Sequence, residues 1–271
     1  MIKKFEKYVL ITDMDGTLID SKGNISEENI NAIRYFVEQG GKFTIATGRM
    51  VESARRYVKD LPVELPVILY NGTKIFDFIK EETINEYFLE DEIKELIKEI
   101  KKNQSSLGIE IYAEENVYIF NSCRFTERFS KKGYEVFYKI PNELWERKWT
   151  KILILGEEEE MDVLEEHFED CYGKTNLIRS GENYLEIIPK GTSKGHAMEH
   201  LCKSFNLDIS KVIAVGDNMN DLELLLKASY GFCVENGNKK LMNQVKYKTK
   251  CNDNHAIAHV IEWLEKNIVK V

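Results

Sequence analysis

The chain has 271 residues, of which 43% are hydrophobic and 31% are charged, and its formal net charge is −8. This composition is that of a globular protein with an acidic surface, and it argues against nucleic acid as a partner because binding a phosphate backbone requires a basic surface. No segment is apolar for long enough to cross a membrane, and we expect no signal peptide, because the first expected strand begins at residue 8.

The cysteines are scattered, odd in number and without the C-x-x-C spacing of a metal or redox site. We expect reduced thiols and a cytoplasmic protein, since disulfides are rare in that compartment. The five cysteines are Cys123, Cys171, Cys202, Cys233 and Cys251.

The first part of the chain alternates strand patterns with helix patterns. Ser26 can cap the first helix, and Gly40 can end it. Such alternation predicts right-handed crossovers and a parallel sheet, in which ligands bind beyond the carboxyl ends of the strands. The expected strands cover 8–12, 42–46 and 66–70, and the expected helices cover 27–39 and 51–59.

From about residue 83 the rhythm changes, and an α+β segment with a largely antiparallel sheet is expected. We expect this segment to be an inserted cap domain at 81–188 that governs substrate specificity, with the core domain at 1–80 and 189–271. The expected helices of the insert cover 90–102 and 157–168, and its expected strands cover 108–112, 116–120, 151–155, 174–178 and 184–188.

The strand and helix alternation then returns. The predicted fold class is therefore α/β, with a Rossmann-like parallel-sheet core that is split in sequence by the cap. The expected elements are helices over 193–205, 222–226 and 256–267, and strands over 211–216 and 231–234.

Two carboxylates, Asp13 and Asp15, follow the first expected strand, and Gly16 and Thr17 come next. The side chains of Asp13 and Asp15 would share one side if the strand persisted. Two like charges so close require a positive partner, and oxygen ligands favour Mg²⁺. A carboxylate nucleophile and a metal at the carboxyl end of a strand are the resulting hypothesis, with Thr17 holding the turn.

Three further signals fall at strand or helix ends. Thr47 and Gly48 offer a hydroxyl and a backbone N–H where an anion can be held. Lys194 lies early in its helix, where a cation opposes the helix dipole and a bound phosphate would explain it. Asp217, with Asn220 and Asp221 after it, forms another acidic strand end.

These parts are the ones that phosphoryl transfer needs, because a carboxylate can approach a phosphate only where cations and polar donors offset the repulsion. Asp13 would attack phosphorus and form an aspartyl-phosphate. Asp15 would protonate the leaving oxygen and then deprotonate the attacking water. Asp13, the main-chain carbonyl of Asp15 and Asp217 would hold Mg²⁺.

Each signal also has a structural interpretation when it is taken alone. Asp13 to Gly16 could be a turn, Thr47-Gly48 a strand-to-helix connection, Lys194 a solvated helix residue and Asp217-Asn218 a helix cap. Their conjunction at successive element ends favours function. The histidine pairs at 196/200 and 255/259 have helical spacing, but they lack the H-E-x-x-H glutamate and a third ligand, so surface or partly packed histidines are expected.

With these residues laid out, the chain resembles the haloacid dehalogenase-like (HAD) hydrolase superfamily, in its Cof-type branch with a type IIB cap. The resemblance covers essentially the whole chain, with small departures at Gly237 and at 254–256 that lie outside the main motifs. The matching motifs are Asp13-Met14-Asp15-Gly16-Thr17, Ala46-Thr47-Gly48-Arg49, Gly191-Thr192-Ser193-Lys194-Gly195 and Gly216-Asp217-Asn218-Met219-Asn220-Asp221, with Asn71-Gly72 and Val234-Glu235-Asn236-Gly237 as further turns.

The resemblance implies a Mg²⁺-dependent phosphatase that acts on small phosphorylated metabolites, often sugar phosphates. It implies that Asp13 is the nucleophile and that Asp15 is the acid/base. It also implies that Asp221 supports the metal ligands without binding the metal itself. The residues implied to contact phosphate are Met14 through its main chain, Thr47, Gly48, Lys194 and Asn220.

Two alternative functions remain open at this stage. A phosphomutase of the phosphomannomutase type shares the cap and the core residues but returns the phosphoryl group to the substrate. A non-catalytic phospho-acceptor or metabolite-binding module would also use an Asp, a Thr and a Lys on a parallel sheet, although it would not need an acid at Asp15. The expected partner is a small phosphorylated metabolite, and a monomer or a weak homo-oligomer is expected.

Overall fold

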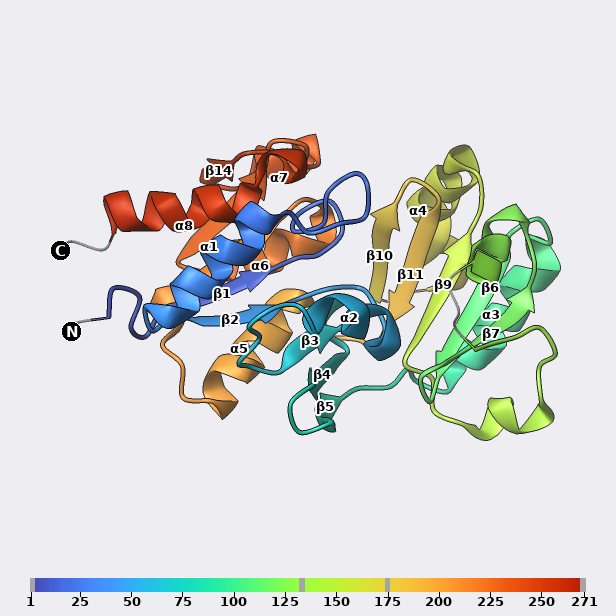
Figure 1. Ribbon diagram of the computed structural model, residues 1–271. Coiled ribbons are helices and arrows are strands. Elements are labelled where there is room, and N and C mark those ends of the chain that lie inside the picture. The colour runs from blue at the N-terminus through green and yellow to red at the C-terminus, as the bar shows by residue number, and fades with distance from the viewer. Residues whose placement is uncertain (1–2, 132–134, 174–175, 269–271) are drawn as a thin grey trace. The chain divides into compact units, whose positions relative to one another are not determined.

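The computed structural model describes residues 3–131, 135–173 and 176–268 (Figure 1). The chain forms two compact units, of which one joins Met1–Asn85 with Ser193–Val271 and the other is Glu86–Thr192. The two outer segments of the chain therefore fold together, and the segment between them is a unit of its own. The second unit begins at Glu86 and ends at Thr192, whereas the segment expected from the sequence covers 81–188.

A parallel sheet is the centre of the first unit, with the strands in the order β14-β13-β12-β1-β2. The opening strand β1 lies inside the sheet, because Val9 is opposite both Val212 of β12 and Lys42 of β2. The expected α/β fold with a Rossmann-like core is thus confirmed. The bounds are β1 Val9–Thr12, β2 Lys42–Ile45, β12 Val212–Gly216, β13 Tyr230–Val234 and β14 Tyr247–Thr249.

The third expected strand, 66–70, runs parallel to β2 as predicted, but its regular pairing is not with the parallel sheet. β3 (Val67–Leu69) joins the sheet only through a parallel bridge between Ala46 and Ile68. Its regular partner is the antiparallel β4 (Lys74–Asp77), which is followed by β5 (Glu82–Glu86). The chain reverses after β3, so this strand also begins a small sheet with β4 and β5.

The helices of the first unit flank the parallel sheet. Ser26 caps α1 as expected, since its Oγ accepts a hydrogen bond from Asn29 N at 3.3 Å. α1 and α8, at opposite ends of the chain, lie side by side (Figure 1). The bounds are α1 Glu27–Glu38, α2 Val51–Val58, α5 Lys194–Ser204, α6 Leu222–Lys227, α7 Lys239–Met242 and α8 Ala256–Asn267.

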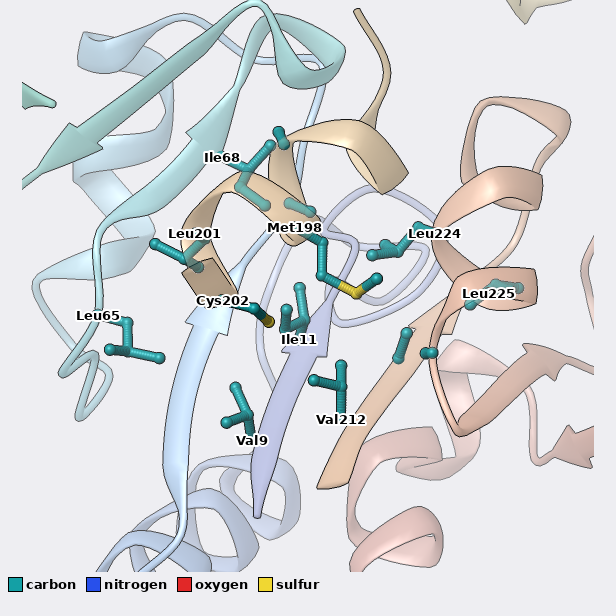
Figure 2. Close-up of a cluster of buried hydrophobic side chains, with 14 of the residues drawn as sticks. Val9, Ile11, Leu65, Ile68, Met198, Leu201, Cys202, Val212, Leu224 and Leu225 are labelled. Carbon is teal, nitrogen blue, oxygen red and sulfur yellow. The ribbon is translucent and has the colours of Figure 1, made fainter. Parts of the chain in front are cut away.

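The other face of the sheet packs against α5 and α6 through a cluster of apolar side chains (Figure 2). Val9 and Ile11 of β1 point toward Met198 and Cys202 of α5 in this cluster, and all four are buried. Burial of this surface stabilises the unit by about 25 cal/mol for each Å² of apolar area removed from water. It also anchors α5, whose first residue is Lys194, against β1.

The second unit is a sheet in the order β10-β11-β9-β6-β7-β8, antiparallel except between β7 and β8. Both of its helices pack with the apolar side chains of β6, β9 and β11 in a separate core. Residues 174–175 of the expected hairpin lie outside the described residues. The bounds are α3 Glu92–Asn103, β6 Gly108–Ala113, β7 Asn116–Asn121, β8 Val136–Phe137, β9 Lys151–Leu155, α4 Glu158–Tyr172, β10 Asn176–Gly181 and β11 Tyr184–Ile188.

Short 3-10 turns complete the structure. Within the described residues, no helix has the length and apolar character needed to cross a membrane. All five cysteines are free thiols. The 3-10 turns are η1 Tyr70–Gly72, η2 Arg124–Lys131, η3 Asn142–Glu146, η4 Ile209–Lys211, η5 Met219–Asp221 and η6 Asn252–Asn254.

Candidate active site

The chain bends sharply where β1 ends, and this bend separates the two carboxylates. Asp13 still follows the strand, because its N–H donates to Val215 O at 2.8 Å. Met14 O then accepts hydrogen bonds from Leu18 N and Ile19 N, which closes a tight loop. The condition that the strand persists through Asp15 is therefore not met. Asp13 is buried with 5% exposure, whereas the Asp15 side chain is 60% exposed.

Gly16 is required inside this loop for two reasons. Its φ of +77° lies in the left-handed region, which residues with a Cβ rarely adopt. A Cβ on Gly16 would also lie 2.6 Å from Asp217 Oδ2. Thr17, buried next to it, donates from its Oγ1 to Asp217 Oδ1 at 3.3 Å. The loop after β1 is therefore built against the carboxylate that follows β12.

Lys194 is fully buried at the start of α5, with no exposed side-chain surface. Ser193 caps the helix, because its Oγ accepts from His196 N at 2.9 Å. The Lys194 ammonium donates to Asp13 Oδ1 at 2.7 Å and to Asp221 Oδ1 at 2.6 Å. A buried cation at a helix amino end is unfavourable by itself, so these two carboxylates are what stabilise it. The alternative of a solvated Lys194 is excluded.

Asp221 organises the loop after β12. Its Oδ2 accepts hydrogen bonds from the backbone N–H groups of Asp217 at 2.9 Å and Asn218 at 3.2 Å. Because its Oδ1 is bound to Lys194, both oxygens are engaged by donors of the protein. Asn218 also caps the turn at Met219, so the structural interpretation of this loop is correct as well. Asp217 is held in place by these bonds and by Thr17.

The site can hold a divalent cation. Asp13, Asp217 and Asp221 each offer an oxygen, and these oxygens lie within 4.8 Å of one another. Such an oxygen donor set suits Mg²⁺. Since Asp221 is occupied by Lys194 and backbone donors, Asp13 and Asp217 are the better ligands, and Asp221 supports them. Within the described residues, neither histidine pair belongs to a group of metal-binding geometry.

Crowding and burial perturb the ionisation of these groups. Burial raises the pKa of Asp13 well above its usual range, although Lys194 opposes this shift. Burial, with the neighbouring charge of Asp221, raises the pKa of Asp217 to about 7. Burial disfavours the charged form of Lys194, but the two carboxylates outweigh it and raise its pKa. In the metal-free protein, Lys194 alone does not balance the negative charge of the buried carboxylates, so binding of a further cation beside them would be favoured.

The loop after β2 carries Thr47, Gly48 and Arg49. Thr47 is buried, its N–H donates to Ile68 O at 2.9 Å, and its Oγ1 accepts from Arg49 N at 3.2 Å. The hydroxyl, not the N–H, is therefore the group of Thr47 with which an anion could bond. Because the carboxyl ends of β1 and β2 are adjacent in the sheet, this loop lies beside Asp13, as expected.

Arg49 holds the exposed carboxylate of Asp15 in a bidentate ion pair, with Nε to Oδ2 at 2.7 Å and Nη2 to Oδ1 at 2.6 Å. Its guanidinium also lies 4.7 Å from the centre of the Tyr57 ring and donates to Ser53 Oγ at 3.2 Å. Sequence reasoning gave Arg49 no role. Its place directly after Thr47-Gly48 was the available signal.

Asn71 and Asn236 also contact the loops of the site, and sequence reasoning gave neither of them a role. Asn220 donates from its Nδ2 to Asn71 Oδ1 at 3.0 Å, so the turn after β3 contacts the loop after β12. Asn236 donates to Gly16 O at 2.8 Å and supports the loop after β1. The Asn-Gly turn and the Gly-Asn-Ala-like turn were visible in the sequence, but their contacts were not.

Comparison with known proteins agrees with this geometry. The family model described as haloacid dehalogenase-like hydrolase matches residues 10–261. A candidate phosphatase of Streptococcus pyogenes serotype M6 is 30% identical over 270 residues, which cover 94% of this chain and 98% of that protein. The 5-amino-6-(5-phospho-D-ribitylamino)uracil phosphatase YwtE of Bacillus subtilis is 25% identical over 280 residues, with 93% and 96% covered.

A solved structure of a haloacid dehalogenase-like hydrolase from Bacteroides thetaiotaomicron is similar along almost its whole length. It superposes with a TM-score of 0.80 at 26% identity, covering 95% of this chain and 99% of that one. The fold and the clustered carboxylates with their buried lysine define a hydrolase of the phosphatase class. The chain belongs to the haloacid dehalogenase-like hydrolase family, in its Cof-type branch.

Proposed function

We propose that the protein is a Mg²⁺-dependent phosphatase that hydrolyses phosphate monoesters of small metabolites, sugar phosphates above all, through an aspartyl-phosphate on Asp13. The observation that carries this proposal is the buried contact of Lys194 with both Asp13 and Asp221, next to Asp217. Packing alone does not favour a fully buried lysine among three carboxylates. The arrangement is explained if the site binds a dianionic phosphate, because such a group needs positive charge and fixed hydrogen-bond donors.

In the first step, a carboxylate oxygen of Asp13 forms a bond to phosphorus, and the bond from phosphorus to the ester oxygen breaks. Asp13 suits this role because its backbone is part of the sheet and Lys194 fixes its Oδ1 at 2.7 Å. Lys194 also offsets the charge of the phosphoryl oxygens. Thr47 through its hydroxyl, with Gly48, Asn220 and the Met14 main chain, would orient those oxygens.

Asp15 would carry the protons. It gives one to the leaving alcohol oxygen in the first step and takes one from the water that attacks phosphorus in the second, when the bond to Asp13 breaks and phosphate leaves. Its exposure leaves the side chain able to exchange protons with solvent, and the bidentate Arg49 contact supports this role by limiting its orientations.

Mg²⁺, when bound, would neutralise phosphoryl charge and align the phosphate with Asp13. Asp13, the Asp15 carbonyl and Asp217 would hold it, and Asp221 and Thr17 would support that arrangement through their bonds to the Asp217 backbone and side chain. The carboxylate cluster within 4.8 Å supports this choice of donors.

One relative supports the proposed substrate class. The relative from Bacillus subtilis acts, by its name, on a phosphorylated ribityl compound, which is a polyol phosphate. A small phosphorylated metabolite of this kind is therefore our proposal for this chain. The role of the inserted domain in specificity, the cytoplasmic location and the monomeric or weakly oligomeric state stay predictions from the sequence.

The test is hydrolysis of para-nitrophenyl phosphate and of a panel of sugar phosphates, measured as free phosphate with Mg²⁺ and with a chelator. We expect Mg²⁺-dependent release that Asp13→Asn abolishes and that the exposed control Asp60→Asn retains. Wild-type rates in Asp13→Asn would refute the mechanism. Phosphate that appears at a second position of the sugar, without release, would favour a phosphomutase.

A further inference from the structure

The turn after β3 has an unusual backbone in a buried place. Tyr70, Asn71 and Gly72 follow one another with φ values of 51°, 56° and 100°. Only glycine enters this left-handed region without steric cost, and a run of such residues is rare. Tyr70 and Asn71 are each 1% exposed. Strained backbone of this kind persists only where the surrounding contacts require it, and it is common at functional sites.

The contacts of this turn lead to the loop after β2 and to the start of α5. Asn71 N donates to Thr47 O at 3.0 Å, and Tyr70 N donates to Arg49 O at 3.1 Å. Gly72 packs so tightly on α5 that a Cβ there would lie 2.0 Å from Ser193 O. The turn therefore holds the backbone of two elements from which the proposed phosphate-binding residues come.

The Asn71 side chain reaches a third such element. Its Oδ1 accepts from Asn220 Nδ2 at 3.0 Å, across 149 positions of the chain. Its carboxamide also lies against Gly48, since a Cβ on Gly48 would be 3.0 Å from Asn71 Nδ2 and 3.1 Å from Oδ1. One buried side chain thus contacts both Gly48 and Asn220.

We propose that Asn71 is a positioning residue that orients the Asn220 carboxamide and the Gly48 backbone for phosphate, an inference that rests on the proposed function. A terminal carboxamide rotates about a broad, nearly two-fold torsion, so its oxygen and nitrogen can exchange places. By accepting a hydrogen bond from Asn220 Nδ2, Asn71 fixes the positions of the nitrogen and the oxygen of the Asn220 carboxamide. Without it, Asn220 can turn its oxygen toward the phosphate, and the two acceptors repel each other.

The test variant is Asn71→Gly, which removes the carboxamide and retains a residue that accepts positive φ. We expect its KM for para-nitrophenyl phosphate and its inhibition constant for inorganic phosphate to rise together by about fivefold, the loss of one hydrogen bond. The Mg²⁺ concentration for half-maximal activity should change by less than about twofold, because Asn71 acts on Asn220 and Gly48, and neither of these is a proposed metal ligand.

Asn206→Gly is the matched control, because Asn206 has a φ of 51° and lies beyond the other end of α5. It should leave all three quantities unchanged. A fall in kcat with unchanged KM and phosphate inhibition in Asn71→Gly, together with a lower melting temperature, would mean a loss of folded enzyme and would overturn the positioning role.

Asn220→Ala and the double variant Asn71→Gly/Asn220→Ala test whether Asn71 acts through Asn220. We expect the KM of the double variant to lie within about twofold of that of Asn220→Ala. Effects that multiply would overturn the inference. A wild-type protein that releases no phosphate from any ester would instead refute the proposed function, so the two failures are distinguishable.

Discussion

Replacing Lys194 by methionine removes the only charge of a side chain whose shape is largely retained. The Lys194 side chain has no exposed surface, and the side chains of its two carboxylate partners, Asp13 and Asp221, are 7% and 0% exposed. Removal of one partner from a buried ion pair costs about 3–5 kcal/mol, because a charge is left buried without compensation. A domain has a free energy of unfolding of about 5–15 kcal/mol, so the loss is a large fraction of the total.

The size of this loss should depend on pH and on Mg²⁺. Burial raises the pKa of Asp13, and its protonation relieves the repulsion, so the difference from wild type should be smaller at pH 5 than at pH 8. Mg²⁺ should restore part of the stability at pH 8, because it supplies positive charge at Asp13 and Asp217. Turnover should fall by about a hundredfold or more even with saturating Mg²⁺, since a preorganised charge is lost.

Urea unfolding followed by circular dichroism, with Mg²⁺ and with a chelator, measures these differences. Lys203→Met is the control, because Lys203 is an exposed residue of the same helix and should change the free energy of unfolding by no more than about 0.5 kcal/mol. Equal stability of Lys194→Met and wild type at pH 8 in chelator would refute the view that Lys194 compensates the carboxylates.

Three further outcomes follow from the geometry. Arg49→Met should slow hydrolysis of an alkyl phosphate about tenfold more than that of para-nitrophenyl phosphate, because only the poorer leaving group depends on a well-placed acid at Asp15; equal slowing in steady-state assays would contradict this. In the metal-free protein, burial raises the pKa of Asp217 to about 7, whereas the pKa of an aspartate in the unfolded chain is about 3.9. Between these two pH values the folded state therefore binds more protons than the unfolded state. As pH rises through this window, the free energy of unfolding falls. Urea titrations in chelator should show a weaker decline in Asp217→Asn, and an unchanged decline would count against the shift. Ser26→Ala should cost about 1 kcal/mol in unfolding and leave turnover unaltered, since it removes the cap on Asn29 N and the 2.9 Å hydrogen bond between the Ser26 hydroxyl and His255 Nδ1; an intact melting temperature would show that these bonds contribute nothing.

Local patterns predicted most elements of the fold well. The cap at Ser26 and the final helix at Ala256–Asn267 were predicted as the structure has them. β4 and β5 were not predicted, because Asn71-Gly72 was interpreted only as the end of the third strand and not as a reversal into an antiparallel partner. β14, at Tyr247–Thr249, is too short an edge strand to leave a periodic pattern.

The sequence by itself determined which chemical groups stand at the ends of β1, β2, α5 and β12, because strand and helix boundaries follow from local composition. It also determined the family, through motifs that include Asp13 and Lys194. Only the tertiary structure decided which of those groups are buried and which residues they contact. In the folded protein Asp13 is buried and Asp15 is exposed. Asp15 forms an ion pair with Arg49, and Asn71 forms a hydrogen bond with Asn220. The physical reason is that such contacts link residues far apart in the chain, and their geometry depends on how loops turn after strands end.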